Sequence, residues 1–263
     1  MFSRSSRART LAGIAAVATL ALTACSDTSS DTDNDAAGDS SESYSIGINQ
    51  LVQHPALDAA AEGFKEAFEE AGVDVEFDEQ NANGEQATAL TISQQFAGAD
   101  LDMVLAVATP AAQATAQNIT DIPVVFTAVT DAESAELVES NDAPGGNVTG
   151  TSDAAPIEDQ LDLLKEIVPD AQSIGIVYAS GEVNSQVQVD AVQEAAGPRD
   201  LEVVTQTVTT ANDIQQAVEA LGDVDAIYVP TDNMVVSGIA SLVQVAEQKQ
   251  IPVIAAEAGT VEG

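Results

Sequence analysis

From Tyr44 onward, apolar and polar residues alternate in a pattern whose period changes at regular intervals. Short β-branched runs predict buried strands, and between them apolar residues recur at helical spacing. The predicted strands are 44–48, 73–77, 103–107, 124–126, 147–151, 173–178, 201–207, 225–229 and 251–255. The predicted helices are 55–71, 85–97, 110–118, 183–196, 211–221 and 235–248. This alternation predicts an α/β fold in which helices cover both faces of parallel sheets.

Turn-forming residues interrupt the alternation near 139–156. Pro144, Gly145, Gly146 and Gly150 favour turns on either side of one short strand. We interpret this stretch as a crossing between two lobes of similar design, on which ligands bind outside the carboxyl ends of the strands. The predicted organisation is lobe I at 44–130, a crossing or hinge segment at 131–154 and lobe II at 155–263.

The first 43 residues have a different composition. Three arginines precede an apolar run at 11–22, which is typical of an export signal and too short to span a bilayer. The run ends in Leu22-Thr23-Ala24-Cys25, which resembles the lipobox of bacterial lipoproteins. The resemblance implies that residues 1–24 are removed and that Cys25 is lipidated; an ordinary signal peptide is the alternative. Residues 25–43 lack large apolar side chains and are expected to form a flexible acidic linker.

The charge balance limits the possible partners. The chain has 43 acidic and seven basic residues, and three of the basic ones fall within the first 24. Nucleic acid is therefore not an expected partner, and contact with a membrane is expected only through the lipid anchor. One histidine, one cysteine and the absence of a nucleophile elbow or phosphate loop argue against an enzyme. No metal or cofactor is predicted.

Polar residues follow most of the predicted strands, and they suit a small zwitterion. A helix N-terminus can bind a carboxylate, and an aspartate or glutamate can pair with an ammonium group. Thr109 before Pro110 predicts an N-cap hydroxyl followed by proline at the first helical position. Capping is also an alternative explanation for Asp232 and Asn233, which precede a predicted helix.

Several motifs occur in an order that resembles a known family. They are Gln53-His54-Pro55-Ala56-Leu57-Asp58, Ala108-Thr109-Pro110-Ala111, Thr149-Gly150-Thr151-Ser152-Asp153, Asn184-Ser185 and Thr231-Asp232-Asn233. Together they resemble the ABC-transporter substrate-binding proteins that bind tryptophan or related aromatic amino acids. The resemblance implies a type I periplasmic-binding-protein fold of two Rossmann-like lobes joined by a hinge, with an integral permease and a cytoplasmic ATPase as partners. It also implies further elements after Gly263, so the chain is expected to be truncated at its C-terminus.

Position by position, the resemblance implies a set of ligand contacts from both lobes and the hinge. The set is His54, Thr109, Pro110, Thr130, Asp131, Thr151, Asp153, Asn184, Ser185, Asp232, Asn233 and Glu257. Asp232 is the expected partner of the ligand's ammonium group. The loop after Asp131 departs from the family pattern, because Ala132 stands where proline is expected. The phenylalanines are expected in the core, and Tyr178 is the aromatic residue expected to face the cleft.

The sequence therefore predicts a lipid-anchored, extracytoplasmic solute-binding protein of an ABC importer. The expected ligand is an amino acid, preferably an aromatic one such as tryptophan or phenylalanine. A sugar or nucleoside receptor of the same fold is an alternative, although tryptophan is absent and Arg199 is the sole arginine after residue 24. A ligand sensor for a membrane signalling partner is a second alternative.

Overall fold

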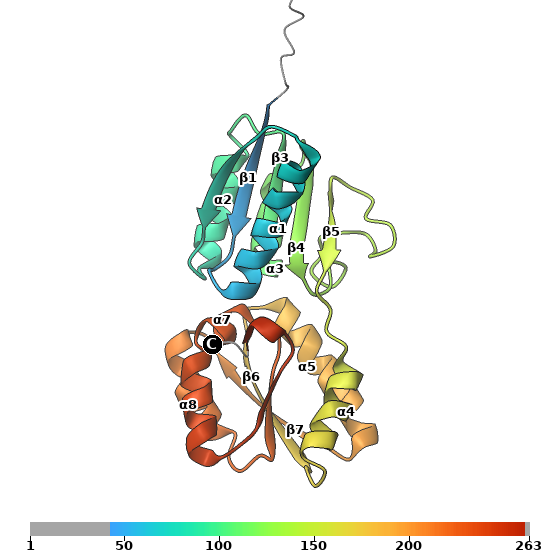
Figure 1. The fold of residues 1–263 in the computed structure, drawn as a ribbon, viewed down its shortest axis with the longest axis vertical. Coiled ribbons are helices and arrows are strands. Elements are labelled where there is room, and N and C mark those ends of the chain that lie inside the picture. The colour runs from blue at the N-terminus through green and yellow to red at the C-terminus, as the bar shows by residue number, and fades with distance from the viewer. Residues whose placement is uncertain (1–42, 261–263) are drawn as a thin grey trace, which may run out of the picture. The chain divides into compact units, whose positions relative to one another are not determined.

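The computed structural model describes residues 43–260, whose strands form two parallel sheets (Figure 1). The first sheet has the order β2-β1-β3-β4-β5 and the second the order β7-β6-β8-β9. The strands are β1 (Tyr44–Gln50), β2 (Val75–Asn81), β3 (Met103–Val107), β4 (Val124–Val129), β5 (Val148–Ser152), β6 (Ser173–Ala179), β7 (Glu202–Val208), β8 (Ala226–Val229) and β9 (Val253–Ala255). The predicted α/β class with two parallel sheets is confirmed.

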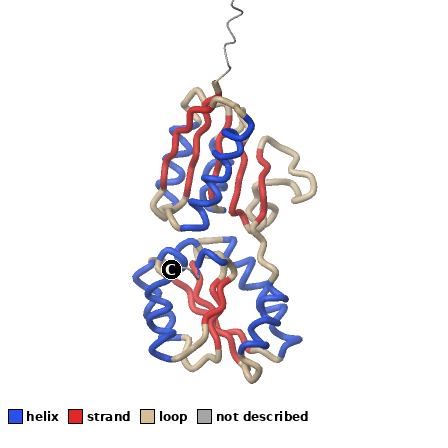
Figure 2. Tube along the Cα trace, viewed as in Figure 1, coloured by secondary structure: helices blue, strands red, loops and turns tan. Residues whose placement is uncertain are grey.

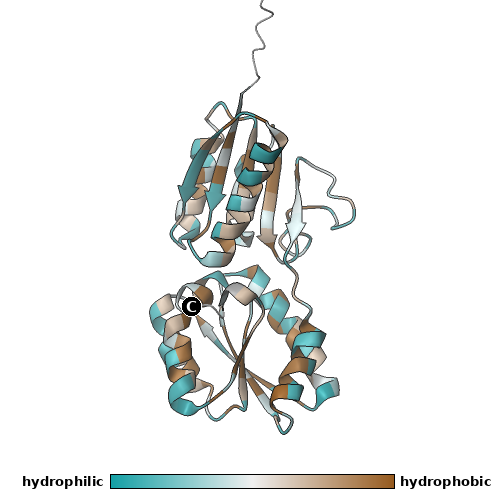
Figure 3. Cartoon of the chain, in the orientation of Figure 1, coloured by the Kyte–Doolittle hydropathy of each residue, from teal (hydrophilic) through white to brown (hydrophobic). Residues whose placement is uncertain are grey.

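Helices connect the strands, and each helix carries both hydrophobic and hydrophilic residues (Figures 2 and 3). They are α1 (Pro55–Ala71), α2 (Gln86–Phe96), α3 (Thr109–Asn118), α4 (Ile157–Ile167), α5 (Val183–Ala196), α6 (Ile214–Ala220), α7 (Asn233–Ser237) and α8 (Ile239–Lys249). Helix α1 ends as the sequence predicts, because Gly72 adopts a left-handed conformation with φ of 68°. Its amide donates to the carbonyl of Glu69 at 3.0 Å.

Two helical regions differ from the predictions. Helix α4 was not predicted, although Ile157, Leu161 and Leu164 recur at helical spacing and the two leucines are buried. The predicted helix 235–248 is divided into α7 and α8 at Gly238. A Cβ atom at Gly238 would lie 2.5 Å from the side chain of Ile214, so the break allows α6 to pack closely.

The five described phenylalanines pack against the first sheet or against one another, as predicted, but Phe126 also lines a cavity, which was not predicted. Phe96 and Phe126 are buried in its core. Phe64, Phe68 and Phe77 contact one another edge to face, with ring centroids 5.1 to 6.5 Å apart. These aromatic side chains therefore contribute to packing in the first lobe.

The segment predicted as a crossing contributes β5 to the first sheet. Its residues pair in parallel with β4, with Phe126 opposite Gly150 and a register shift between Phe126 and Val129. The lobe boundaries themselves stay predictions. The predicted signal peptide, Cys25 and the linker up to residue 42 lie outside the described residues. Within the described part, no helix is long and apolar enough to cross a membrane.

Loops at the carboxyl ends of strands from both sheets contact one another. The side-chain amide of Gln86, after β2, donates to the carbonyl of Gly181, after β6, at 2.9 Å. The hydroxyls of Thr130, after β4, and Thr231, after β8, lie 3.4 Å apart. The fold thus brings together the strand ends at which ligands of such sheets bind.

Candidate functional site

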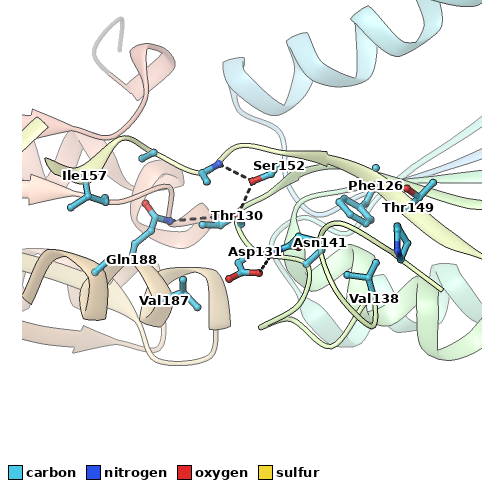
Figure 4. A pocket seen from close by; sticks show the side chains of 16 residues that line it. Phe126, Thr130, Asp131, Val138, Asn141, Thr149, Ser152, Ile157, Val187 and Gln188 are labelled. Carbon is cyan, nitrogen blue, oxygen red and sulfur yellow. Dashed lines mark hydrogen bonds between the residues drawn. The ribbon is translucent and has the colours of Figure 1, made fainter. Parts of the chain in front are cut away.

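A buried group of polar side chains connects these strand ends. We call it the polar network; it consists of Thr130, Glu182, Asn184, Ser185, Gln188, Thr231, Asp232 and Asn233. Gln188 is central to it, because its Oε1 accepts from the Thr231 amide at 3.1 Å and its Nε2 lies 3.5 Å from the Thr130 hydroxyl (Figure 4). The network thus links the end of β4 with helix α5.

The carboxylate of Glu182 accepts hydrogen bonds from several groups of the second lobe. One of its oxygens accepts from the side-chain amides of Asn184 at 3.1 Å and Asn233 at 2.6 Å. The other accepts from the backbone amide of Met234 at 3.1 Å. Burial raises the pKa of Glu182 to about 7, and the negative charge of Asp232 contributes to the shift.

Asp232 lies deeper than expected for a ligand contact. Its side chain is fully buried and caps the N-terminus of α7 by accepting from the Val235 amide at 2.8 Å. Its second oxygen accepts from the amide of Ala179 at 2.6 Å and the hydroxyl of Ser185 at 2.7 Å. Burial raises its pKa. Both oxygens are thus engaged within the second lobe.

Five buried side-chain atoms of the described residues have no hydrogen-bond partner, and four of them belong to residues that the sequence placed in the site. The four are His54 Nδ1, Thr109 Oγ1, Asp153 Oδ1 and Asn184 Oδ1. They follow β1, β3, β5 and β6 respectively, whereas the fifth, Asn49 Oδ1, lies within β1. Unpaired buried polar atoms are rare and costly, so these four are candidates for contact with a ligand.

The start of α3 differs from the prediction. Ala108, rather than Thr109, occupies the N-cap position, so the expected capping hydroxyl is wrong. Ala108 has φ of 81° and ψ of 151°, a conformation that only glycine adopts without strain. Because the helix starts one residue early, the Thr109 hydroxyl makes no capping bond and lies 1% exposed. Pro110 is also buried.

Two other predicted residues, Asp131 and Thr151, have different surroundings. Asp131 accepts from Ser134 and Asn141 of its own loop, both at 3.0 Å, and these hydrogen bonds hold its pKa below the usual value. Thr151 is exposed and donates to Thr127. Asp131 and Thr151 are therefore outside the polar network.

Two carboxylates lie near each other at the end of the network. Burial raises the pKa of Asp153, and the negative charge of Glu257 raises it further, while the Thr130 hydroxyl opposes the shift. Glu257 is half-buried and accepts from the Thr260 hydroxyl at 3.1 Å.

Two cavities adjoin the polar network. The first, of about 400 Å³, is lined by Thr130 and Gln188 and has apolar walls that include Phe126, Val138 and Ile157 (Figure 4). The second, of about 320 Å³, is lined by residues of both lobes, among them Pro110 and Glu182. Both volumes lie at the lower end of the range for small-molecule sites.

Sequence reasoning missed Glu182, Gln188 and Thr231 as members of the network. Glu182 lies in the polar run after β6, and Gln188 follows Asn184 by one helical turn on the same face. Helical spacing from Asn184 could therefore have identified Gln188. No local pattern indicates that Glu182 contacts Asn233, 51 residues away.

Comparisons with known proteins agree with this architecture. The family model described as ABC transporter substrate binding protein matches residues 45–263. A relative named tyrosine-binding protein, from Clostridioides difficile (strain R20291), is 40% identical over 256 residues, which cover 95% of this chain and 74% of the relative.

Two solved structures are similar in fold and sequence. An ABC domain from Streptococcus pneumonia in complex with L-Trp is 37% identical with a TM-score of 0.81, covering 84% of this chain and 76% of that one. A ligand-free, open substrate-binding protein with adhesive properties from Clostridium difficile is 44% identical with a TM-score of 0.60, covering 83% and 76%. ABC transporter substrate-binding proteins are extracytoplasmic, deliver a small-molecule ligand to the transporter and are not enzymes. This chain belongs to the ABC transporter substrate-binding protein family.

Proposed function

We propose that this protein is the lipid-anchored receptor of an ABC importer and that it binds an aromatic amino acid between its two lobes. The observation that carries the proposal is the set of four unpaired, buried polar atoms, which follow strands of both sheets. A zwitterionic ligand would supply hydrogen-bond partners to such atoms. The anchor rests on the lipobox-like sequence that ends at Cys25.

The ligand's carboxylate is assigned to the start of α3. This ten-residue helix presents free amide groups and the positive end of its dipole at its N-terminus. The Thr109 hydroxyl is buried there without a partner and can donate a further hydrogen bond. The strain at Ala108 is consistent with a turn that is held in shape for binding.

The aromatic class rests on the relatives and on the cavity walls. One relative is named for tyrosine binding and another structure contains L-Trp, at 40% and 37% identity. Phe126, Val138 and Ile157 provide the apolar surface that an aromatic side chain needs.

Binding is expected to hold the lobes together. The bond between Gln86 and Gly181 and the contact between Thr130 and Thr231 join the two lobes directly. The fold also resembles the L-Trp complex more closely than the ligand-free, open structure, although the latter is more similar in sequence.

Calorimetric titration with tyrosine, tryptophan and phenylalanine tests the proposal. At least one of them should bind, and Thr109→Ala should weaken its binding about tenfold, because a hydrogen bond to a charged group is lost. Thr91→Ala removes an exposed hydroxyl of α2 and should leave the affinity unchanged. A folded protein that binds glucose or uridine, but none of the three amino acids, would contradict the proposal.

A further inference from the structure

We propose that Ala108 and Ala128 are positioning residues. Each holds a strained backbone turn that keeps a nearby polar side chain, Thr109 or Thr130, in place before a ligand binds. This assignment rests on the proposed function, since it names residues that prepare the same binding site. It concerns the backbone, and neither methyl group is given a contact with the ligand.

The two alanines stand out among the described residues with a positive φ angle. Six such residues are not glycine, and a positive φ costs energy when a Cβ atom is present. Four of the six are exposed polar residues in turns or at helix ends: Asn83, Glu136, Asp200 and Gln250. The other two are Ala108, with φ of 81°, and Ala128, with φ of 54°. Ala108 is buried and Ala128 is half-buried, so the two differ from the rest in residue type and in burial.

Ala108 joins β3 directly to α3 without a linking residue. Its amide donates to the carbonyl of Thr127 of β4 at 3.1 Å, and its carbonyl accepts from the amide of Ala112 in α3 at 3.0 Å. Because one residue serves both elements, the chain must change direction within one pair of dihedral angles. The pair adopted, φ of 81° and ψ of 151°, lies in a region that is essentially restricted to glycine. The turn places the unpartnered Thr109 hydroxyl in the interior at the start of the helix.

Ala128 lies in a bulge at the end of β4. The strand advances three residues, from Phe126 to Val129, while its partner β5 advances two. The left-handed residue of a β-bulge is usually glycine, and a bulge re-aims the side chains that follow it. The hydroxyl of Thr130, directly after β4, accepts from Nε2 of Gln188 in the second lobe at 3.5 Å (Figure 4). The bulge thus orients Thr130 toward the polar network.

The two turns lie side by side, because β3 and β4 are neighbours and the amide of Ala108 bonds to the residue before Ala128. Strained conformations persist only where the surroundings over-determine them, and they are concentrated at ligand-binding and switch regions. Glycine would relieve the strain at both positions, but it would also allow each turn to move. Alanine narrows the conformations of the ligand-free protein. A ligand then meets Thr109 and Thr130 already in position and does not have to order them.

The first test replaces each alanine by glycine and measures the binding of L-tryptophan, L-tyrosine and L-phenylalanine by calorimetry. Ala108→Gly and Ala128→Gly should each weaken the tightest-bound amino acid about two- to fivefold, because a glycine turn must be ordered on binding. The melting temperature of each variant should stay within about 4 °C of the wild type, since relief of strain offsets the lost methyl group. A larger fall would show that the alanine is not strained and would overturn the assignment.

Amide hydrogen exchange of the ligand-free protein tests the same turns without a ligand. Two amides report on them: that of Ala112, which bonds to the Ala108 carbonyl, and that of Asp153, which bonds to the Val129 carbonyl at 3.2 Å. Ala108→Gly should speed the exchange of the first, and Ala128→Gly should speed that of the second. Bound amino acid should remove most of both differences. Faster exchange throughout the first lobe would indicate a general loss of stability and would contradict a local positioning role.

The matched control is Gln250→Gly, which relieves a φ of 59° at the exposed end of α8. It should keep the wild-type affinity and the wild-type exchange of both reporter amides. Wild-type affinity in the folded alanine variants, or an equal loss of affinity in Gln250→Gly, would overturn the assignment. A wild type that binds none of the three amino acids would remove the proposed function. Unchanged exchange of the reporter amides would overturn the present assignment independently of any ligand.

Discussion

At the scale of single residues, neighbours rather than residue type decide which polar groups are free. Asp153 and Asp232 are both aspartates that follow strands of parallel sheets. Three donors occupy the oxygens of Asp232, whereas one buried oxygen of Asp153 has none. Asp232 therefore contributes to the fold, whereas Asp153 keeps one buried oxygen without a donor.

The titration of Glu182 gives a prediction at this scale. Its pKa is about 7 in the folded protein against an ordinary value of 4.5, so folding disfavours its ionised form. The free energy of unfolding that Glu182 contributes should therefore fall as the pH rises from about 4.5 to about 7. Glu182→Gln should remove this component, and the wild type should lose stability relative to the variant across that interval.

Urea unfolding at a series of pH values measures the difference. Glu194→Gln, on the exposed part of α5, serves as the matched control and should differ from the wild type by a constant amount. A constant difference for Glu182→Gln as well would show that this carboxyl does not titrate with a raised pKa.

At the scale of helices and strands, the local sequence pattern sets where an element begins and ends, whereas close packing between elements sets where a helix breaks and which sheet a strand joins. The bounds of α1 and β3 agree with the prediction to the residue, because their periodicity is strong and their ends are marked by turn residues. The break at Gly238 and the place of β5 in the first sheet depend on neighbouring elements, Ile214 of α6 and Phe126 of β4.

The contact between β4 and β5 can be tested at Gly150. A Cβ atom there would overlap the carbonyl oxygen of Phe126 and lie 2.6 Å from its ring. Gly150→Ala should therefore lower the free energy of unfolding by about 1–3 kcal/mol, as overpacking does. Gly146→Ala, where a Cβ atom meets nothing within 4 Å, should change it by less than about 0.5 kcal/mol. Chemical denaturation measures both, and equal stability of the two variants would contradict the packing argument.

At the scale of the whole molecule, the proposed site depends on both lobes and on little positive charge. Thr109 and Asp153 follow strands of the first sheet, and Asn184 follows a strand of the second. The chain has four basic residues beyond position 24 and 43 acidic ones, and none of the four forms an ion pair with Asp153 or Glu257. A cationic group of the ligand would therefore enter a negatively charged site.

The proposed anchor gives a prediction at this scale. If Cys25 is acylated, Cys25→Ser should move most of the protein from the membrane fraction to the soluble fraction of bacterial cells, since each buried CH₂ of an acyl chain contributes about 0.8 kcal/mol. Ser26→Ala should leave the distribution unchanged. Fractionation followed by immunoblotting measures both, and membrane retention of the Cys25→Ser protein would argue against lipid attachment at this residue.

The alternation of strands and helices, the α/β class and the family-like motifs can all be derived from the amino-acid sequence, because periodicity and turn chemistry are local properties. Which side chains of these motifs keep a hydrogen-bonding atom without a partner follows from the three-dimensional packing alone. The Asn184 amide is oriented by Thr231, 47 residues away, and Asp232 is engaged by Ala179, 53 residues away. Both contacts lie within the second lobe and depend on its strand order and on how α5 and α7 pack at the strand ends, so no local pattern distinguishes Asp153 from Asp232.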